Sequence, residues 1–129
     1  MYRDPFDLAR QMAYAAEPRT TRYLHGSVIL DRKGRIIGTG KNHFIGRQIL
    51  LEGAYVDKTV HSEAHALRRV DIRRLDDAVM INYGRTATSA ILARPCSTCW
   101  SILKKLGFKK VFYTERSPLL KPVWVEERF

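Results

Sequence analysis

Hydrophobic and polar positions recur with clear periods along most of the chain, and these periods predict its helices and strands. Residues 5–16 show a roughly helical spacing of apolar side chains, and Glu17-Pro18 should end this helix. Leu24 to Leu30 and Arg35 to Thr39 have the pattern of two strands. The DRKG segment between them has turn chemistry, so a β-hairpin is expected after the first helix.

The segment that follows the hairpin has no sustained period. Residues 41–58 mix apolar and polar side chains and include glycines at positions 46 and 53. This pattern predicts a loop, with a short helix near residues 47–52.

Helical spacing returns at Val60, because Val60, Ala64, Leu67 and Val70 fall on one face of a helix. The stretch DAVMINY, which ends at Tyr83, then reads as a buried strand. Residues 84–94 are expected to form a second loop.

Pro95 is expected to open another helix, and Gly107 is its expected stop. The predicted apolar stripe of this helix is Cys99, Ile102, Leu103 and Leu106. KKVFYTE (109–115) reads as a strand, while the tail 116–129 fits either a strand or an ordered arm. Strands that alternate with helices predict an α/β fold, here as one domain over residues 1–129.

Composition places the chain among ordinary globular domains. It has 129 residues, of which 45% are hydrophobic. No apolar run approaches the roughly 20 residues of a membrane helix, and the acidic residues near the N-terminus are atypical of a signal peptide. We therefore expect a cytoplasmic location and no membrane partner.

The charge balance favours anionic partners. The chain has 23 Lys plus Arg against 13 Asp plus Glu, for a net charge of +10. Such a surface suits nucleotides or nucleic acid, although a well-solvated charged exterior accounts for it equally.

Two short segments carry the candidate chemistry, VHSEAHAL (60–67) and RPCSTC (94–99). In a reducing compartment, Cys96 and Cys99 fit metal ligands or a redox pair better than a structural disulfide. They lie at a predicted helix start, where unpaired N–H groups favour thiolate and should lower the thiol pKa. His61 is the candidate for a third ligand, and three protein ligands leave a fourth position open to water, as in catalytic zinc sites.

Glu63 gains a role in such a site. Residues two apart on a helix point to different sides, but they converge on a target beyond the helix N-terminus. His61 could then bind the metal while Glu63 takes a proton from water and delivers it to a leaving group.

Two alternatives do not require catalysis by zinc. A structural zinc site would be closed by a fourth ligand, for which His65, His43 and His25 are the candidates. A thioredoxin-like redox pair has the same C-x-x-C spacing but leaves the HSE segment unexplained.

An H-x-E motif followed by P-C-x-x-C is the signature of zinc nucleobase deaminases. HSEAHAL and RPCSTCWSILKKLGFKKVFYTE resemble the cytidine and deoxycytidylate deaminase superfamily over roughly residues 5–115. The resemblance implies an α/β fold with three layers (α-β-α) and a mixed five-stranded sheet. It also implies that His61, Cys96 and Cys99 hold Zn²⁺ and that Glu63 moves the proton.

The same resemblance suggests residues that bind the substrate. Asn42, at the end of GTGKN, would contact the sugar and position the base, and the backbone N–H of Ser62 would bind the base. Arg47 and Arg94 are candidates for binding phosphate. Ser62 and Arg94 depart from the residues common in the family, and loop 84–94 is longer than in compact members.

The expected reaction is zinc-dependent deamination of a cytosine base in a small-molecule nucleoside or nucleotide, by a homo-oligomer. One alternative is a deaminase of single-stranded DNA or RNA, and another is a non-catalytic zinc protein that binds nucleic acid. A purine or a pterin-like ring is a further alternative substrate. Aromatic residues that could stack on an unpaired base are Tyr55, Tyr83, Trp124 and Trp100, the last of these expected in the core.

Overall fold

A computed structural model describes residues 4–16, 23–49 and 55–129, with the side chains of 43–49 and 55–60 left out of the description. Two short elements, η2 (Ile72–Arg74) and β8 (Ser117–Pro118), join the longer ones. In chain order the helices are α1 (Pro5–Tyr14), α2 (Ser62–Leu67) and α3 (Ser97–Lys105). The strands are β1 (Leu24–Leu30), β2 (Ile36–Lys41), β3 (His43–Ile49), β4 (Tyr55–Val60), β5 (Val79–Arg85), β6 (Ser89–Ile91), β7 (Lys110–Glu115) and β9 (Val123–Arg128).

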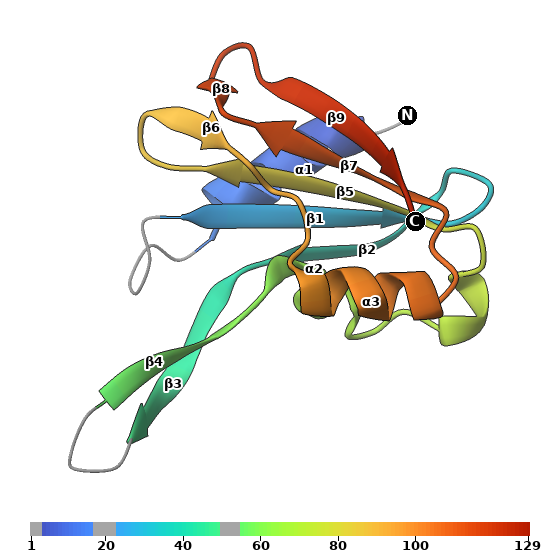
Figure 1. The fold of residues 1–129 in the computed structure, drawn as a ribbon, viewed down its shortest axis with the longest axis horizontal. Coiled ribbons are helices and arrows are strands. Elements are labelled where there is room, and N and C mark those ends of the chain that lie inside the picture. The colour runs from blue at the N-terminus through green and yellow to red at the C-terminus, as the bar shows by residue number, and fades with distance from the viewer. Residues whose placement is uncertain (1–3, 17–22, 50–54) are drawn as a thin grey trace.

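A mixed β-sheet forms the centre of the molecule (Figure 1). Its five long strands lie in the order β2-β1-β5-β7-β9, and the β5–β7 pair is parallel while the other three pairs are antiparallel. The short strands β6 and β8 extend the sheet beside β5. The predicted mixed sheet with helices on both faces is confirmed, with the two short strands added to the five long ones.

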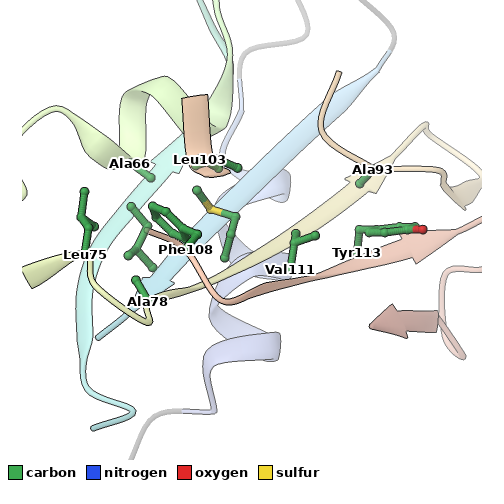
Figure 2. Packing of buried hydrophobic residues seen from close by; sticks show 10 residues of the cluster. Ala66, Leu75, Ala78, Ala93, Leu103, Phe108, Val111 and Tyr113 are labelled. Atoms are coloured by element: carbon green, nitrogen blue, oxygen red, sulfur yellow. The ribbon is translucent and has the colours of Figure 1, made fainter. Parts of the chain in front are cut away.

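Neighbouring residues of each central strand face opposite layers, because side chains alternate along a strand. In β1, Val28 packs with the buried face of α1, while Ile29 joins the core under α2 and α3. Figure 2 shows this second core, in which Leu103 of α3 lies close to Phe108. Burial on both faces accounts for the unbroken apolar runs Val28–Leu30 in β1 and Val79–Ile81 in β5.

Local signals set the start of α1 and the turn after β1. The Asp4 side chain caps α1 by accepting from the N–H groups of Phe6 and Asp7, and Pro5 occupies the first turn. In the turn, Gly34 has a φ of +82°, a conformation that glycine adopts without strain. Both elements match the prediction from sequence.

Gly40 determines how closely α2 approaches the sheet. A Cβ atom at this position would collide with the backbone of Ser62 and Ala66 in α2. The absence of a side chain at Gly40 therefore seats the start of α2 directly on β2.

The loop predicted for residues 41–58 is wrong. Its described parts form β3 and β4, an antiparallel hairpin that projects from the body (Figure 1). Residues 47–49 of the predicted short helix are in β3, and 50–52 lie outside the described residues. The register shifts between Phe44 and Gly46, and a bulge of this kind breaks the alternation by which a strand is recognised.

Other features also differ from the prediction, and the structure decides the open question of the tail. The helix expected from Val60 begins only at Ser62 and ends at Leu67, and the loop 84–94 contains β6. The tail, for which two interpretations were left open, forms β9 against β7. Ile102, expected in the apolar stripe of α3, is 47% exposed.

None of the helices in the described part of the chain is both long and apolar enough to cross a lipid bilayer.

Candidate active site

The N-termini of α2 and α3 bring the three predicted metal ligands together. His61 is the N-cap residue of α2, Cys96 is the N-cap residue of α3, and Cys99 lies in the first turn of α3. One ligand atom from each residue lies within 4.8 Å of the others, and Cys99 Sγ is 3.6 Å from His61 Nδ1. The Cys99 N–H also points to Cys96 Sγ at 3.5 Å, which orients that sulfur.

This donor set fits zinc. Two sulfurs and one imidazole nitrogen are ligands that zinc prefers, and ligands on a tetrahedral zinc ion lie about 3.6 Å apart. The observed sulfur-to-nitrogen distance of 3.6 Å agrees with that geometry.

The protein's own groups oppose ionisation of Cys99. Burial raises the pKa of its thiol to about 12, and the charges of Glu63 and Cys96 act in the same direction. The lowering expected from the helix start is therefore wrong for Cys99. A divalent cation would offset these effects, since a thiol that coordinates a metal is deprotonated.

Among the described residues, the group of possible metal ligands consists of His61, Cys96 and Cys99, and it includes none of the candidates for a fourth ligand. His65 Nδ1 instead accepts from the Lys41 N–H of β2 at 3.0 Å. His25 lines the neighbouring cleft, where burial lowers its pKa while the charge of Glu63 acts the other way. The side chain of His43 is outside the description.

The carboxyl group of Glu63 receives two hydrogen bonds. The Ser62 hydroxyl donates to Oε1 at 3.2 Å, and the Asn82 amide donates to Oε2 at 3.3 Å. Ser62 is 2% exposed and Asn82 is also 2% exposed, so both donors reach Glu63 from the interior. Hydrogen bonds to both oxygens restrict the rotation of the carboxyl group.

A cleft of about 260 Å³ joins Glu63 to two of the metal-ligand candidates. Its walls come from the ends of β1 and β2, the start of α2, and the segment before α3. The lining residues are Tyr23, His25, Asn42, His61, Ser62, Glu63, Ala93, Arg94 and Cys96.

Asn42 lies in this cleft, but its side chain also serves the fold. Its Oδ1 accepts from the His25 N–H at 2.8 Å, and its Nδ2 donates to the Tyr23 carbonyl at 3.0 Å. These bonds hold the start of β1 at the wall of the cleft. A substrate could use only the remaining N–H and lone pair of the amide.

Arg94 lines the cleft as well, yet its guanidinium already has partners. It donates to both carboxylate oxygens of Glu127 at 2.9 and 3.1 Å and lies over the Trp100 ring at 4.3 Å. The bidentate pair with Glu127 raises the pKa of Arg94 and makes it a weaker phosphate ligand than the sequence indicated. The side chain of Arg47, the other phosphate candidate, lies outside the described residues.

Sequence reasoning missed Ser27 and Asn82, which reach Ser62 and Glu63 from the sheet. The available signal was a polar residue inside each of two apolar strands, GSVIL and VMINY. It also missed Tyr23 as a wall of the cleft.

Comparisons with known proteins agree with this site. A family model described as the cytidine and deoxycytidylate deaminase zinc-binding region matches residues 3–115. A cytidine deaminase from Burkholderia pseudomallei has a similar structure, with a TM-score of 0.60 and 12% identity over 96% of this chain and 89% of that one. A glutamate-to-glutamine mutant of the cytidine deaminase from Mycobacterium tuberculosis has a TM-score of 0.50 and 18% identity, covering 90% of this chain and 84% of that one.

No curated protein matches this sequence. At such low identity the solved structures support the fold alone, whereas the family model spans most of the chain and both chemical motifs. The chain therefore belongs to the family defined by the cytidine and deoxycytidylate deaminase zinc-binding region.

Proposed function

We propose that this protein is a zinc-dependent hydrolase that converts a cytosine base, in a nucleoside or nucleotide, to uracil and ammonia. One observation carries the proposal: the Glu63 carboxyl group lines the same small cleft as His61 and Cys96, which lie with Cys99 in the metal-ligand group. A purely structural zinc site has no need of a carboxyl group there. The family match supports the same chemistry.

Each group has a defined task in this reaction. Zinc held by His61, Cys96 and Cys99 would lower the pKa of a water molecule toward about 7 and so supply the attacking oxygen. Glu63 takes one proton from that water and gives it to the ring nitrogen next to the reacting carbon. Once the water oxygen has bonded to the ring carbon, Glu63 takes the second proton of that oxygen and passes it to the exocyclic amine. The C–N bond then breaks, the oxygen becomes the carbonyl oxygen of the uracil product and ammonia leaves.

The walls of the cleft suggest how the base is held. We assign the backbone N–H of Ser62 to the base and the free positions of the Asn42 amide to the sugar. Tyr23 offers an aromatic wall on the same side as His25. Aromatic and polar groups around one cleft are typical of sites for small ligands.

The size of the cleft and the packing of two tryptophan rings favour a small substrate over a polynucleotide. A volume of about 260 Å³ is just below the usual range for ligand sites and suits a single base with its sugar. Trp100 packs against Phe129, and Trp124 packs against Phe6 on the other face, so neither ring offers a platform at the cleft. A homo-oligomer, which the family resemblance implies, completes the proposal, together with the cytoplasmic location expected from the sequence.

A substrate panel tests the proposal. The zinc-loaded protein is incubated with cytidine, deoxycytidine, CMP, dCMP and single-stranded DNA, and uracil products and ammonia are measured. We expect turnover of one or more of the four small compounds, with loss of activity on chelation and recovery when zinc is returned. Turnover of the DNA alone would replace the proposed substrate class, and zinc-loaded protein that deaminates none of the five would contradict the proposal.

A further inference from the structure

Two buried polar residues lie side by side in the centre of the sheet. Ser27 of β1 and Asn82 of β5 are direct cross-strand partners, and they are 0% and 2% exposed. The next strand contributes Gly40 opposite Ser27, where the start of α2 rests on the sheet. Burying polar groups is unfavourable unless they are hydrogen-bonded, so these side chains must satisfy one another or α2.

The surroundings fix the orientation of the Asn82 amide. Its Nδ2 lies 3.3 Å from the Ala93 carbonyl oxygen and 3.3 Å from Glu63 Oε2, and both of these oxygens require a donor. The amide oxygen must therefore face Ser27, whose Oγ is 2.7 Å away. Because a hydroxyl has one proton, Ser27 donates its proton to Asn82. The single proton of the Ser62 hydroxyl is then shared between Ser27 Oγ at 2.7 Å and Glu63 Oε1 at 3.2 Å.

This chain of hydrogen bonds ends on the carboxyl group that the proposed function uses. Asn82 holds Oε2 of Glu63 from the sheet, while the Ser62 hydroxyl lies 3.2 Å from Oε1. A carboxyl group that moves protons must stay within reach of its partners, and a displacement of about 1 Å can lower the rate roughly 100-fold.

We propose that Asn82, oriented by Ser27, is a positioning residue that aims the Glu63 carboxyl group into the cleft. The inference rests on the proposed function for its kinetic consequence. The alternative is that these hydrogen bonds only hold α2 against the sheet. Holding α2 in place would affect stability and zinc retention, whereas positioning affects kcat while zinc content stays the same.

Kinetics on the substrate found in the panel separates these readings. We expect Asn82→Ala to lower kcat roughly 100-fold and Ser27→Ala to lower it roughly tenfold, with KM and zinc stoichiometry close to wild type. Ser27→Thr keeps the hydroxyl and should restore kcat. The Ser27→Ala/Asn82→Ala double variant should be no slower than Asn82→Ala alone, because Ser27 acts through Asn82.

Thr114→Val is the matched control. Thr114 is a fully buried strand residue whose hydroxyl also makes two hydrogen bonds, accepting from the Gly84 N–H and donating to the Ile91 carbonyl. Loss of the Thr114 hydroxyl should lower the melting temperature as much as Ser27→Ala does, while kcat stays unchanged. Equal effects of Ser27→Ala and Thr114→Val on kcat would overturn the positioning role.

A spectroscopic measurement decides the question without a substrate. In the ¹⁵N-labelled, zinc-loaded protein, the side-chain amide signals of Asn82 should shift in Glu63→Gln and in Ser27→Ala but not in Thr114→Val. A high-resolution crystal structure of the wild-type protein should show Asn82 Nδ2 within hydrogen-bonding distance of Glu63. A Glu63 carboxyl group turned away from Asn82 would overturn the inference, even if every variant failed to fold. If the panel yields no substrate, the proposed function fails, and these two measurements still test the contact.

Discussion

At the scale of single residues, Glu63 is the group whose chemistry can be removed with the least change of shape. Glu63→Gln keeps the size of the side chain and a hydrogen-bonding oxygen but can no longer take up and release a proton. We expect kcat to fall roughly 1,000-fold while zinc stoichiometry stays the same, because general acid–base catalysis typically contributes about 10²–10⁴-fold. Steady-state kinetics and metal analysis on the same sample check this, and an active variant would remove Glu63 from the proton path.

The metal ligands make a second prediction at this scale. His61→Ala and Cys99→Ala each remove one of the three donors that lie within 4.8 Å of one another, so zinc per chain should fall far below that of the wild type. His65→Ala is the matched control, since His65 is on the same helix but bonds to the backbone of β2. Metal analysis after dialysis decides the outcome, and zinc loss in His65→Ala alone would show that the ligands are misassigned.

At the scale of elements, Asp31 joins the β1–β2 turn to η2. Its carboxylate accepts from the N–H and the side chain of Arg35 and from the side chain of Arg74. These interactions, led by the backbone hydrogen bond from Arg35, lower the pKa of Asp31 from 3.8 to about 2. A lowered pKa means that the stabilisation is complete above pH of about 4 and disappears as the pH falls toward 2.

Asp31→Asn should therefore lower the melting temperature at pH 7 by a few degrees. The difference in melting temperature between the variant and the wild type should become smaller as the pH falls from 4 to 2. Asp71→Asn is the comparison, because hydrogen bonds from Arg73 also lower the pKa of Asp71 but by less, so its difference in melting temperature from the wild type should change less with pH. Thermal unfolding across this pH range tests the prediction. A difference that is independent of pH would assign the effect of Asp31 to the shape of the turn and not to its charge.

Elements with an unbroken period could be predicted from sequence, and those without one could not. The spacing of apolar residues is sufficient to predict α1, β1, β5 and β7, because each of these elements buries a regular face. The β3–β4 hairpin was missed because a bulge near Gly46 interrupts its alternation. Residues that meet across the fold were missed as well: Ser27 and Ser62 are 35 positions apart and touch only because Gly40 admits α2.

The central residues of the candidate site could be predicted from sequence because they lie in two contiguous motifs. His61 and Glu63 lie within one short segment, as do Cys96 and Cys99, and their residue types already specify the chemistry. The surroundings of Arg94 were not readable in the same way, since its partner Glu127 comes from a tail whose structure the sequence left open.

At the scale of the whole molecule, the last strand reaches the wall of the cleft. Glu127 of β9 holds the Arg94 guanidinium with two hydrogen bonds and accepts a third from the Tyr113 hydroxyl at 3.0 Å. The preceding residue, Glu126, pairs with Lys110 at 3.0 Å instead. The C-terminal strand thus neutralises a cation at the cleft and so reduces the attraction of a phosphate group there.

Glu127→Ala should release that cation. We expect the ratio of kcat/KM for dCMP to that for deoxycytidine to rise roughly threefold to tenfold, because a free guanidinium can bind phosphate through two parallel hydrogen bonds. Glu126→Ala removes an acid from the same strand but leaves Arg94 paired, so its ratio should stay at the wild-type value. Parallel kinetics on both substrates measures the two ratios. An unchanged ratio in Glu127→Ala would mean that the phosphate, where the substrate has one, lies away from Arg94, and the search for its ligand would move to the basic residues of β3.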